Sequence, residues 1–257
     1  MPKLTVDGRT VAVAQGTTVL TAARQAGAQV PTLCHPPALE PGGGCRLCMV
    51  ELTRPEWEGW KKLVAACMAP AEEGAIILTK SDRVESTRRV VVDLLLARCP
   101  DTPLVQELAR THGITSSSFA PNSKPTDCVL CGLCTRACDA LGVGAIAFCG
   151  RGVGREVAPP FNQAPPDCIG CLACAHVCPT RCIPYVDTGS ERRIWGKDFE
   201  MVRCAKCGLA HVTLEQVDYL DRRKGVARAL SSLCDTCKRQ ATLARFAQLA
   251  AGPQGAA

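Results

Sequence analysis

The sequence has few aromatic residues and no long hydrophobic run. Phe, Tyr and Trp make up 4% of its 257 residues, which leaves little large side-chain volume for one continuous apolar core. We therefore expect small modules, each folded around an inorganic centre. No stretch approaches the roughly 18 apolar residues of a membrane-spanning helix. The N-terminal segment MPKLTVDGRTV lacks the apolar centre of a secretory signal.

Cysteine, in contrast, is abundant, with 19 residues. At metal-binding spacings and without a secretory signal, cysteines indicate metal ligands in a reducing compartment, so we expect a cytoplasmic protein. The formal net charge of +6 counts these cysteines as neutral. Because each four-thiolate centre carries about −2 overall, bound centres would offset the excess of Lys and Arg. The charge therefore does not by itself predict a nucleic-acid partner.

Two cysteine runs in the second half of the chain share one spacing. Residues 128–138 and 168–178 both read C-x2-C-x2-C-x3-C, the pattern of a bacterial-type ferredoxin with two [4Fe–4S] clusters. Three cysteines of a run bind one cluster, and we expect the fourth to open a helix that leads to the other. We assign Cys128, Cys131, Cys134 and Cys178 to cluster A (set A), and Cys168, Cys171, Cys174 and Cys138 to cluster B (set B). Zinc knuckles or disulfides are the alternative, but neither requires a doubled pattern.

The N-terminal segment predicts a hairpin followed by a helix. Residues 3–13 alternate around an Asp-Gly pair, which favours a hairpin. Residues 19–27 carry apolar side chains at helical spacing between a Thr cap and a closing Gly. A hairpin, a helix and a cysteine loop, in that order, predict a β-grasp [2Fe–2S] ferredoxin domain over residues 1–80.

Four cysteines in this domain form the candidate [2Fe–2S] site. They are Cys34, Cys45, Cys48 and Cys67, and they read C-x10-C-x2-C-x18-C. Residues 42–44 are all Gly, which suits a main chain that passes close to inorganic sulfide. The alternative to a [2Fe–2S] cluster is a zinc ion bound by the same four cysteines. The long last gap predicts an exposed hairpin tip over residues 54–62, with two Trp side chains that either pack on the domain or contact a partner.

The middle of the chain predicts a helical connector over residues 81–126. Residues 81–98 and 103–112 favour helices, and residues 116–125 favour a linker. Residues 127–186 then form the two-cluster domain. The Gly-rich run 150–154 predicts a turn rather than a nucleotide site, because no helix follows it. Outside the ligand sets, we expect Cys99, Cys149 and Cys182 to be packed thiols, with Cys182 close to cluster A.

The C-terminal part, residues 187–257, carries a fourth cysteine set. Cys204, Cys207, Cys234 and Cys237 read C-x2-C-x26-C-x2-C, which predicts a small zinc-ribbon-like module with a helix over residues 213–220. A further iron–sulfur cluster and free thiols are the alternatives. After Arg245 the composition turns to Ala, Gly and Pro, which predicts a disordered tail. The fold class is therefore α+β, with four parts.

The cysteine spacings of residues 1–186 resemble a known family. They are similar to the N-terminal part of the large iron–sulfur subunit of respiratory complex I and to the diaphorase iron–sulfur subunit of NAD-reducing hydrogenases and formate dehydrogenases. That family also carries an H-x3-C-x2-C-x5-C motif for a further [4Fe–4S] cluster. This chain offers only Cys99 and His112 there, so we expect that cluster to be absent and His112 to be a helix-end or surface residue.

The resemblance implies an electron-transfer subunit without a complete catalytic site. The chain shows no flavin or nicotinamide fingerprint and no ligand set for nickel or molybdenum. The implied partners in a hetero-oligomeric complex are an NAD(H)-linked flavoprotein and a catalytic subunit of hydrogenase, formate dehydrogenase or acyl-CoA reductase type. Two alternatives are a freestanding polyferredoxin and an iron–sulfur regulator that binds nucleic acid through Arg222, Arg223, Lys224, Lys238 and Arg239. Because no aromatic residues accompany these charges, we expect a solvated face instead.

Overall fold

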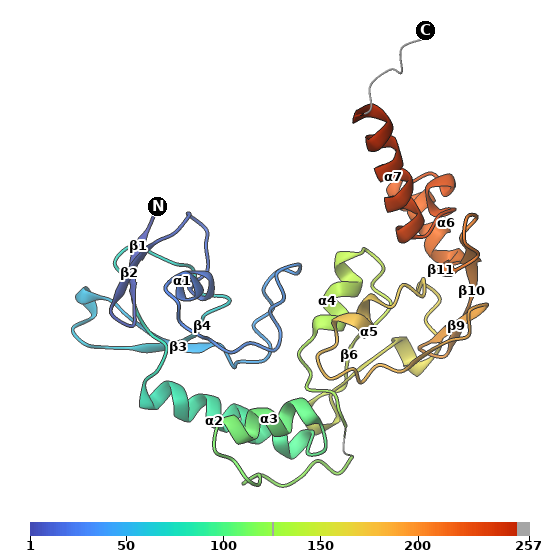
Figure 1. Cartoon of the computed structure of the whole chain (residues 1–257). Coiled ribbons are helices and arrows are strands. Elements are labelled where there is room, and N and C mark those ends of the chain that lie inside the picture. The colour runs from blue at the N-terminus through green and yellow to red at the C-terminus, as the bar shows by residue number, and fades with distance from the viewer. Residues whose placement is uncertain (125, 251–257) are drawn as a thin grey trace.

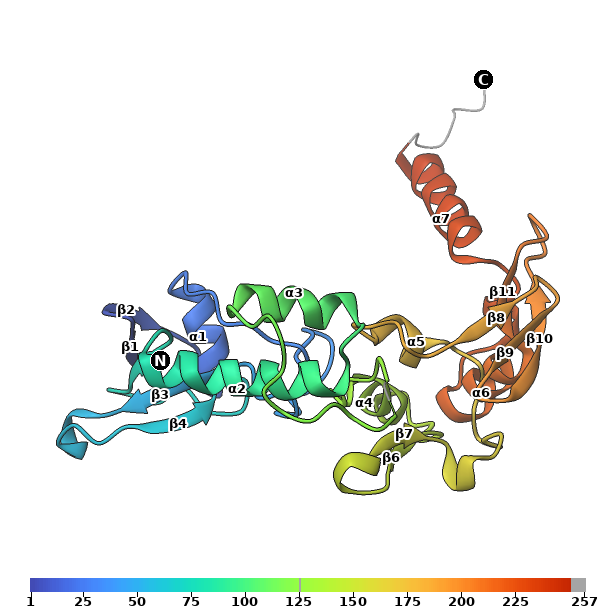
Figure 2. The ribbon, with the colours of Figure 1, turned by 90° about the horizontal axis from the view of Figure 1, so that it is seen from below.

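The computed structural model describes residues 1–124 and 126–250, without the side chains of residues 248–250. Figure 1 shows two lobes, with two helices below and between them, and Figure 2 shows these helices side by side. The N-terminal lobe carries the first cysteine loop. The other lobe carries the two repeated runs and the C-terminal part. No helix in the described part of the chain is long and apolar enough to cross a lipid bilayer.

The N-terminal lobe is a five-stranded sheet covered by one helix. The sheet has the order β2-β1-β5-β3-β4, and β1 and β5 are parallel. Its strands are β1 (Lys3–Val6), β2 (Arg9–Ala12), β3 (Met49–Thr53), β4 (Lys62–Ala65) and β5 (Ile76–Leu78). Asp7 and Gly8 both have positive φ, as a two-residue hairpin turn of this type requires. Helix α1 (Val19–Gln25) begins at the Thr18 cap, so the predicted order of hairpin, helix and loop is confirmed.

The two Trp side chains at the tip of the β3–β4 hairpin differ in exposure. A short 3-10 helix (η1, Pro55–Trp57) forms the tip. Trp57 packs against the core of the lobe, whereas Trp60 is 60% exposed. The two rings meet edge to face with centroids 5.1 Å apart. Trp57 is therefore a packing residue, and only Trp60 presents an apolar surface.

Helices α2 (Asp82–Arg98) and α3 (Pro103–Thr111) form the predicted connector. Arg88 joins α2 to the N-terminal lobe: its buried guanidinium donates hydrogen bonds to the main-chain oxygens of Leu47 and Met49. Cys99, directly after α2, is fully buried, as expected of a packed thiol. His112 caps the end of α3 and is half-buried, so it is a helix-end residue.

The two repeated cysteine runs each lead into a short helix, α4 (Leu133–Ala140) and α5 (Ala173–Val177), and these two helices pack together. The expectation that the fourth cysteine opens the helix was wrong. Gly132 and Leu172 have positive φ just before each helix, so the chain turns there and the third cysteine enters the first turn. The fourth cysteine follows one helical turn later, at the end of the helix.

A hairpin separates the two runs. Strands β6 (Ala147–Cys149) and β7 (Glu156–Ala158) pair antiparallel around a short helix (η2, Gly152–Gly154), and a further 3-10 turn (η3, Pro160–Asn162) follows. The Gly-rich run is therefore a hairpin turn, as expected, and no long helix follows it. Cys149 is half-buried on the outer part of this hairpin.

A four-stranded antiparallel sheet follows the second run, and the sequence patterns did not predict it. Its order is β11-β10-β9-β8. The strands are β8 (Tyr185–Asp187), β9 (Glu191–Ile194), β10 (Lys197–Arg203) and β11 (Ala210–Thr213). The boundary expected after residue 186 falls inside β8. Phe199 and Ile194 of this sheet are buried in the same apolar cluster as Leu172 and Cys134, so the sheet packs on the two-run region.

Three helices complete the C-terminal part: α6 (Leu214–Lys224), η4 (Arg228–Ser231) and α7 (Asp235–Ala250). The predicted helix after Thr213 is confirmed, with the Thr213 hydroxyl as its cap. The disordered tail expected after Arg245 was wrong for residues 246–250, which continue α7, because Ala, Leu and Gln favour a helix. Residues 251–257, which the same prediction covered, lie outside the described residues.

Candidate iron–sulfur and metal sites

The first candidate site lies in the loop between α1 and β3. Cys34, Cys48 and Cys67 are buried, and Cys45 is half-buried. The thiols come in two pairs: the Sγ atoms of Cys48 and Cys67 are 3.4 Å apart, and the Cys45 main-chain N–H donates to Cys34 Sγ at 3.4 Å. Cys67 lies two residues after the end of β4, so the sheet positions it against the loop. The four predicted residues thus converge on one site.

Hydrogen bonds and burial act differently on these thiols. A side-chain hydrogen bond with Cys34, together with nearby main-chain N–H groups, lowers the pKa of Cys45 to about 5, although burial opposes this change. Burial is the main cause that raises the pKa of Cys48 to about 12. The hydrogen bond with Cys45, together with burial, also raises the pKa of Cys34. A bound iron centre requires thiolates, so iron would compensate for the cost of deprotonation at Cys34 and Cys48.

The Gly run beside this site contacts the other lobe. A Cβ on Gly42 would lie 2.7 Å from Nε of Arg136, and a Cβ on Gly44 would lie 3.5 Å from the main-chain oxygen of Cys131. Arg136 donates hydrogen bonds to the main-chain oxygens of Cys34 and Glu40. At Gly42, therefore, the missing side chain makes room for a guanidinium from α4, a reason that the sequence pattern alone did not reveal.

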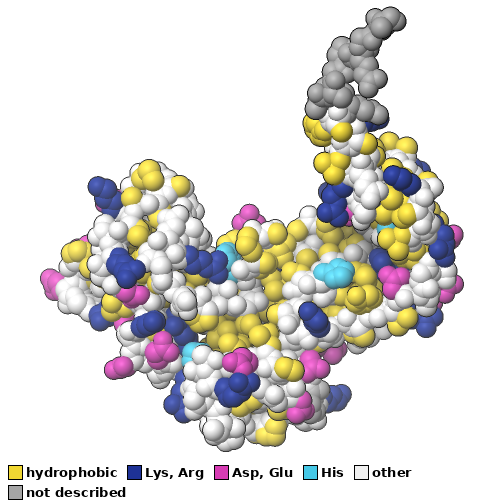
Figure 3. Space-filling model, viewed as in Figure 1, with side chains coloured by type: hydrophobic (Ala, Val, Ile, Leu, Met, Phe, Trp, Pro, Cys, Tyr) yellow, Lys and Arg dark blue, Asp and Glu magenta, His cyan; other side chains and the backbone are white. Residues whose placement is uncertain are grey.

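The cysteines of set A line one cavity. It has a volume of about 350 Å³ and is lined by Cys128, Cys131, Cys134 and Cys178 together with other residues, among them Cys182 and Trp195. Cys182 lies beside the set as expected, with its Sγ 3.5 Å from that of Cys178. Arg98 donates a hydrogen bond to the main-chain oxygen of Cys128 at 2.9 Å. Figure 3 shows apolar side chains, with cysteine counted among them, gathered in the middle of the face that is seen in Figure 1.

The cysteines of set B line a second, smaller cavity. Its volume is about 20 Å³, and its lining includes Cys138, Cys168, Cys171 and Cys174. Cys138 comes from the end of α4, so the first run contributes its fourth cysteine to the lining of the second cavity. Trp195, in the turn between β9 and β10, lines both cavities. Sequence reasoning missed Trp195, because a single Trp outside any motif carries no recognisable pattern.

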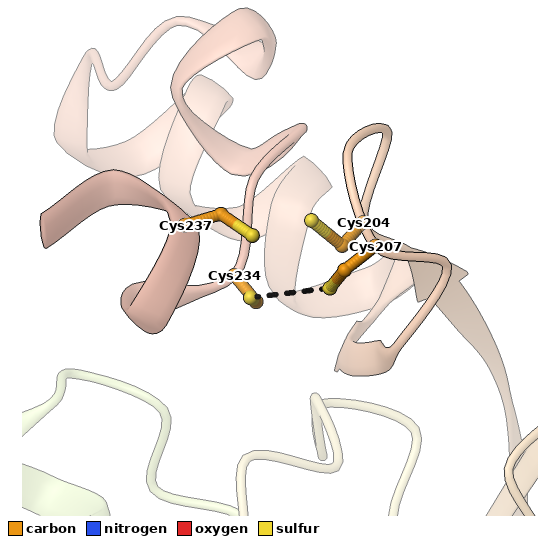
Figure 4. A group of neighbouring side chains, drawn as sticks. All are labelled: Cys204, Cys207, Cys234 and Cys237. Carbon is orange, nitrogen blue, oxygen red and sulfur yellow. Dashed lines mark hydrogen bonds between the residues drawn. The ribbon is translucent and has the colours of Figure 1, made fainter. Parts of the chain in front are cut away.

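The last four cysteines form the tightest cluster. Their four Sγ atoms all lie within 4.8 Å of one another, and Figure 4 shows the side chains of Cys204, Cys207, Cys234 and Cys237 converging. The Sγ atoms of Cys207 and Cys234 are 3.7 Å apart. Tetrahedral zinc with bonds of about 2.3 Å places its sulfurs about 3.8 Å apart. The sulfur spacing therefore suits one tetrahedral ion better than a [4Fe–4S] cluster. Such a cluster binds each thiolate at a separate iron, so its cysteine sulfurs lie farther apart.

Main-chain N–H groups and burial shift the pKa values of two thiols at this site in opposite directions. The N–H groups of Cys234 and Cys207 lower the pKa of Cys204 to about 5. Burial raises the pKa of Cys237 to about 12. Gly208, just after the first pair, has a φ of +74°, which is the turn that a CxxC knuckle needs.

Comparisons with known proteins bear on the first of these sites and on the family of the chain. Residues 2–82 match the family described as 2Fe-2S iron-sulfur cluster binding domain. The chain is 30% identical to an NADH-quinone oxidoreductase subunit of Rhizobium meliloti (strain 1021), over 81% of this chain and 27% of that protein. It is 32% identical to the HndD subunit of the NADP-reducing hydrogenase of Solidesulfovibrio fructosivorans, over 70% of this chain and 35% of that protein.

A solved structure gives the same result. The crystal structure of NAD+-reducing [NiFe]-hydrogenase in the H2-reduced state matches with a TM-score of 0.54 and 32% identity, over 62% of this chain and 75% of that chain. The chain spans only about a third of the length of the two curated relatives, 27% and 35% respectively. The predicted [2Fe–2S] domain and the predicted resemblance are confirmed. This chain belongs to the family of iron–sulfur electron-transfer subunits found in complex I-type oxidoreductases and in NADH- or NADPH-linked hydrogenases.

Proposed function

We propose that the chain relays electrons between an NAD(H)-linked flavoprotein subunit and a catalytic redox subunit of hydrogenase, formate dehydrogenase or acyl-CoA reductase type, in a cytoplasmic complex. The observation that carries this proposal is the succession of three cysteine sets. Gly44, next to Cys45, lies against the main chain of Cys131 in set A. Trp195 then borders both set A and set B. Iron–sulfur clusters supply one-electron chemistry when bound, and such a row of sites suits a relay.

The thiol positions support specific ligand sets. We assign Cys34 with Cys45 to one iron of a [2Fe–2S] cluster and Cys48 with Cys67 to the other, because the thiols lie in these pairs. Set A and set B each hold one [4Fe–4S] cluster. These sites divide the chain into a β-grasp domain (1–80), a connector (81–126), a bacterial-type two-cluster domain (127–186) and a C-terminal module (187–257), with the sheet β8–β11 joining the last two.

For the C-terminal set we propose structural zinc in a zinc-ribbon-like module. The close sulfur spacing supports a single tetrahedral ion. Neither Cys99 nor His112 supports a further cluster in the connector. Cys99 lies in an apolar cluster with Val105 and Val129, and Nδ1 of His112 lies 4.0 Å from a carboxylate oxygen of Glu85.

The surface argues for protein partners over nucleic acid. Arg222 lies 3.9 Å from Asp218, and Lys238 lies 4.0 Å from Asp235, so acidic side chains accompany the C-terminal basic residues. On the face in Figure 3, basic and acidic side chains are interspersed. The relatives are named as subunits of NADH- and NADP-linked enzymes, which favours a fixed complex over a freestanding ferredoxin.

The test is the metal content of anaerobically purified protein, with EPR after stepwise reduction. We expect about 10 iron atoms, about 10 sulfides and about one zinc per chain. Iron near 2 would overturn the assignment of the two [4Fe–4S] clusters. About 14 iron atoms without zinc would make the C-terminal set a fourth cluster. Co-purification of a flavoprotein with this chain tests the proposed partner. Binding to DNA that weakens steeply with added salt would contradict the proposal that the partners are proteins.

A further inference from the structure

The turn between β9 and β10 lies over the loop of set B. Nζ of Lys197 donates to the main-chain oxygens of Pro166 and Cys168, each at 2.8 Å. Nη1 of Arg192 donates to the main-chain oxygen of Gly170 at 2.9 Å, and the Thr213 hydroxyl donates to that of Ile169. The sheet thus binds four main-chain oxygens of the loop that carries Cys168 and Cys171.

Close packing supports these hydrogen bonds. Gly170 has a φ of +66°, and a Cβ there would lie 2.9 Å from ring carbon Cγ of Phe199 and 2.9 Å from Cγ2 of Thr213. Phe199 is 1% exposed. The loop therefore touches the sheet directly, and no room for water remains at this contact. The side chains of the sheet that bind this loop therefore lie close to the cysteines of set B.

Trp195 occupies a backbone conformation that does not suit it. Ile194 pairs with Lys197, so Trp195 and Gly196 form a two-residue turn, and Trp195 has a φ of 55°. Such turns favour Asn, Asp or Gly, and a bulky residue at positive φ costs about 1–3 kcal/mol. The turn alone does not explain a Trp. Its side chain must contribute something that outweighs this cost.

The indole N–H has no other use in the described structure. Trp195 Nε1 is buried and lacks a hydrogen-bond partner among the described residues, although a buried indole N–H normally has one. The indole lines the cavity of set B. A cluster bound by set B would bring sulfur acceptors to the cavity that this indole lines.

From this geometry, and resting on the proposed function, we infer that the β9–β10 turn raises the reduction potential of cluster B through the Trp195 N–H and the Lys197 ammonium group. Reduction adds negative charge to the cluster. Hydrogen-bond donors and nearby positive charge stabilise that added charge. Nζ of Lys197 lies 2.8 Å from the main-chain oxygen of Cys168, so its positive charge is next to a ligand residue of cluster B. Trp195 and Lys197 are positioning residues, since they act through the ligands of cluster B.

The test is a potentiometric EPR titration of the full-length, cluster-loaded chain. Trp195→Phe keeps the ring and removes the N–H. Lys197→Met removes the charge, and Lys197→Arg restores it. Arg193→Gln is the matched control, because Arg193 lies on the same hairpin, is 65% exposed and pairs with Asp198. The signal of cluster B is identified as the one lost in Cys171→Ser.

For Trp195→Phe and Lys197→Met we expect about a tenfold lower ratio of reduced to oxidised cluster B at fixed potential, which is a 59 mV shift for one electron. The potential of cluster A in Lys197→Met, and the potentials of both clusters in Lys197→Arg and Arg193→Gln, should stay near the wild-type values. Should Trp195→Phe lose iron, the Lys197 pair decides alone. If Trp195→Phe and Lys197→Met keep both [4Fe–4S] clusters and the potential of cluster B is unchanged, this inference is overturned. A wild-type chain without two [4Fe–4S] signals would overturn the proposed function instead.

Discussion

The guanidinium group of Arg136 donates a hydrogen bond to the main-chain carbonyl oxygen of Cys34. Arg136 sits on α4 between Cys134 and Cys138, which belong to set A and set B. One side chain therefore joins the loop of the first site to the helix that serves both others. This contact therefore helps to hold the first cysteine site against α4.

Replacement of Arg136 by Met should loosen the two lobes. The variant leaves the carbonyl oxygens of Cys34 and Glu40 without their charged donor, a loss of about 1.5–3 kcal/mol for each bond to a charged group. We expect weaker magnetic interaction between the reduced [2Fe–2S] cluster and cluster A, measured by EPR. Gly42→Ala should act in the same direction, because its Cβ would lie 2.7 Å from Arg136 Nε.

Arg110→Met is the control for this pair of variants. Arg110 is exposed on α3 and pairs only with Glu107 in the described structure, so its loss should leave the magnetic interaction unchanged. An interaction of wild-type strength in Arg136→Met would show that other contacts hold the lobes together.

A second prediction separates Cys178 from its neighbour Cys182. Their sulfurs are only 3.5 Å apart, but only Cys178 fits the doubled spacing. Cys182→Ala should keep both [4Fe–4S] clusters, whereas Cys178→Ala should lose or destabilise cluster A. Iron analysis and EPR measure the difference. Loss of about four iron atoms in Cys182→Ala alone would make Cys182 the ligand.

A third prediction concerns the C-terminal set. Cys207→Ser should remove the zinc and leave the iron content unchanged, because a tetrathiolate ion is lost with one of its ligands. The melting temperature of the C-terminal module should fall, as seen by calorimetry. Cys149→Ser provides a matched thiol outside all four sets and should leave the zinc in place. Loss of iron in Cys207→Ser would point to a cluster rather than zinc.

A fourth prediction uses the buried thiol of Cys99. Burial raises its pKa from 9.0 to about 11. Its folded-state pKa lies above that of the unfolded chain, so the stabilisation is fully present below pH 9 and is lost as the pH rises towards 11. Wild type should therefore lose on the order of 2 kcal/mol more stability than Cys99→Ala over this range.

The measurement is the difference in melting temperature between the two proteins at pH 8 and pH 10.5, at one scan rate. Effects of the ligand thiols are common to both proteins and cancel in this difference. Cys99→Ala should also retain all its iron, because Cys99 is a packed thiol. Parallel pH curves, or a loss of iron, would contradict this role.

Ligand chemistry and local signals made much of this molecule predictable. Cluster geometry restricts cysteine spacing, so the sets that meet around each cavity follow from the sequence. Caps such as Thr18 and Ser81 and the Asp7-Gly8 turn act within a few residues, and the structure confirms them.

The unpredicted features depend on contacts between distant residues. Strand β9 carries three charged residues, Glu191, Arg192 and Arg193, so it lacks the apolar alternation of a predictable strand. Arg192 is nevertheless buried, because it pairs with Asp187 and binds the Gly170 carbonyl. The reason for Gly42 is likewise visible only once Arg136 lies against it. Local patterns contain no record of such partners.

The contacts of Lys197 also bear on the order of events during synthesis. Both cysteine runs leave the ribosome before residue 197 does, since the chain is made from its N-terminus. Until then the Cys168 loop has no sheet above it and is open to incoming iron and sulfide. When the hairpin emerges, Lys197 and Arg192 bind the loop carbonyls and close over it. A cluster bound by set B would therefore meet an uncovered loop only until this hairpin has been made.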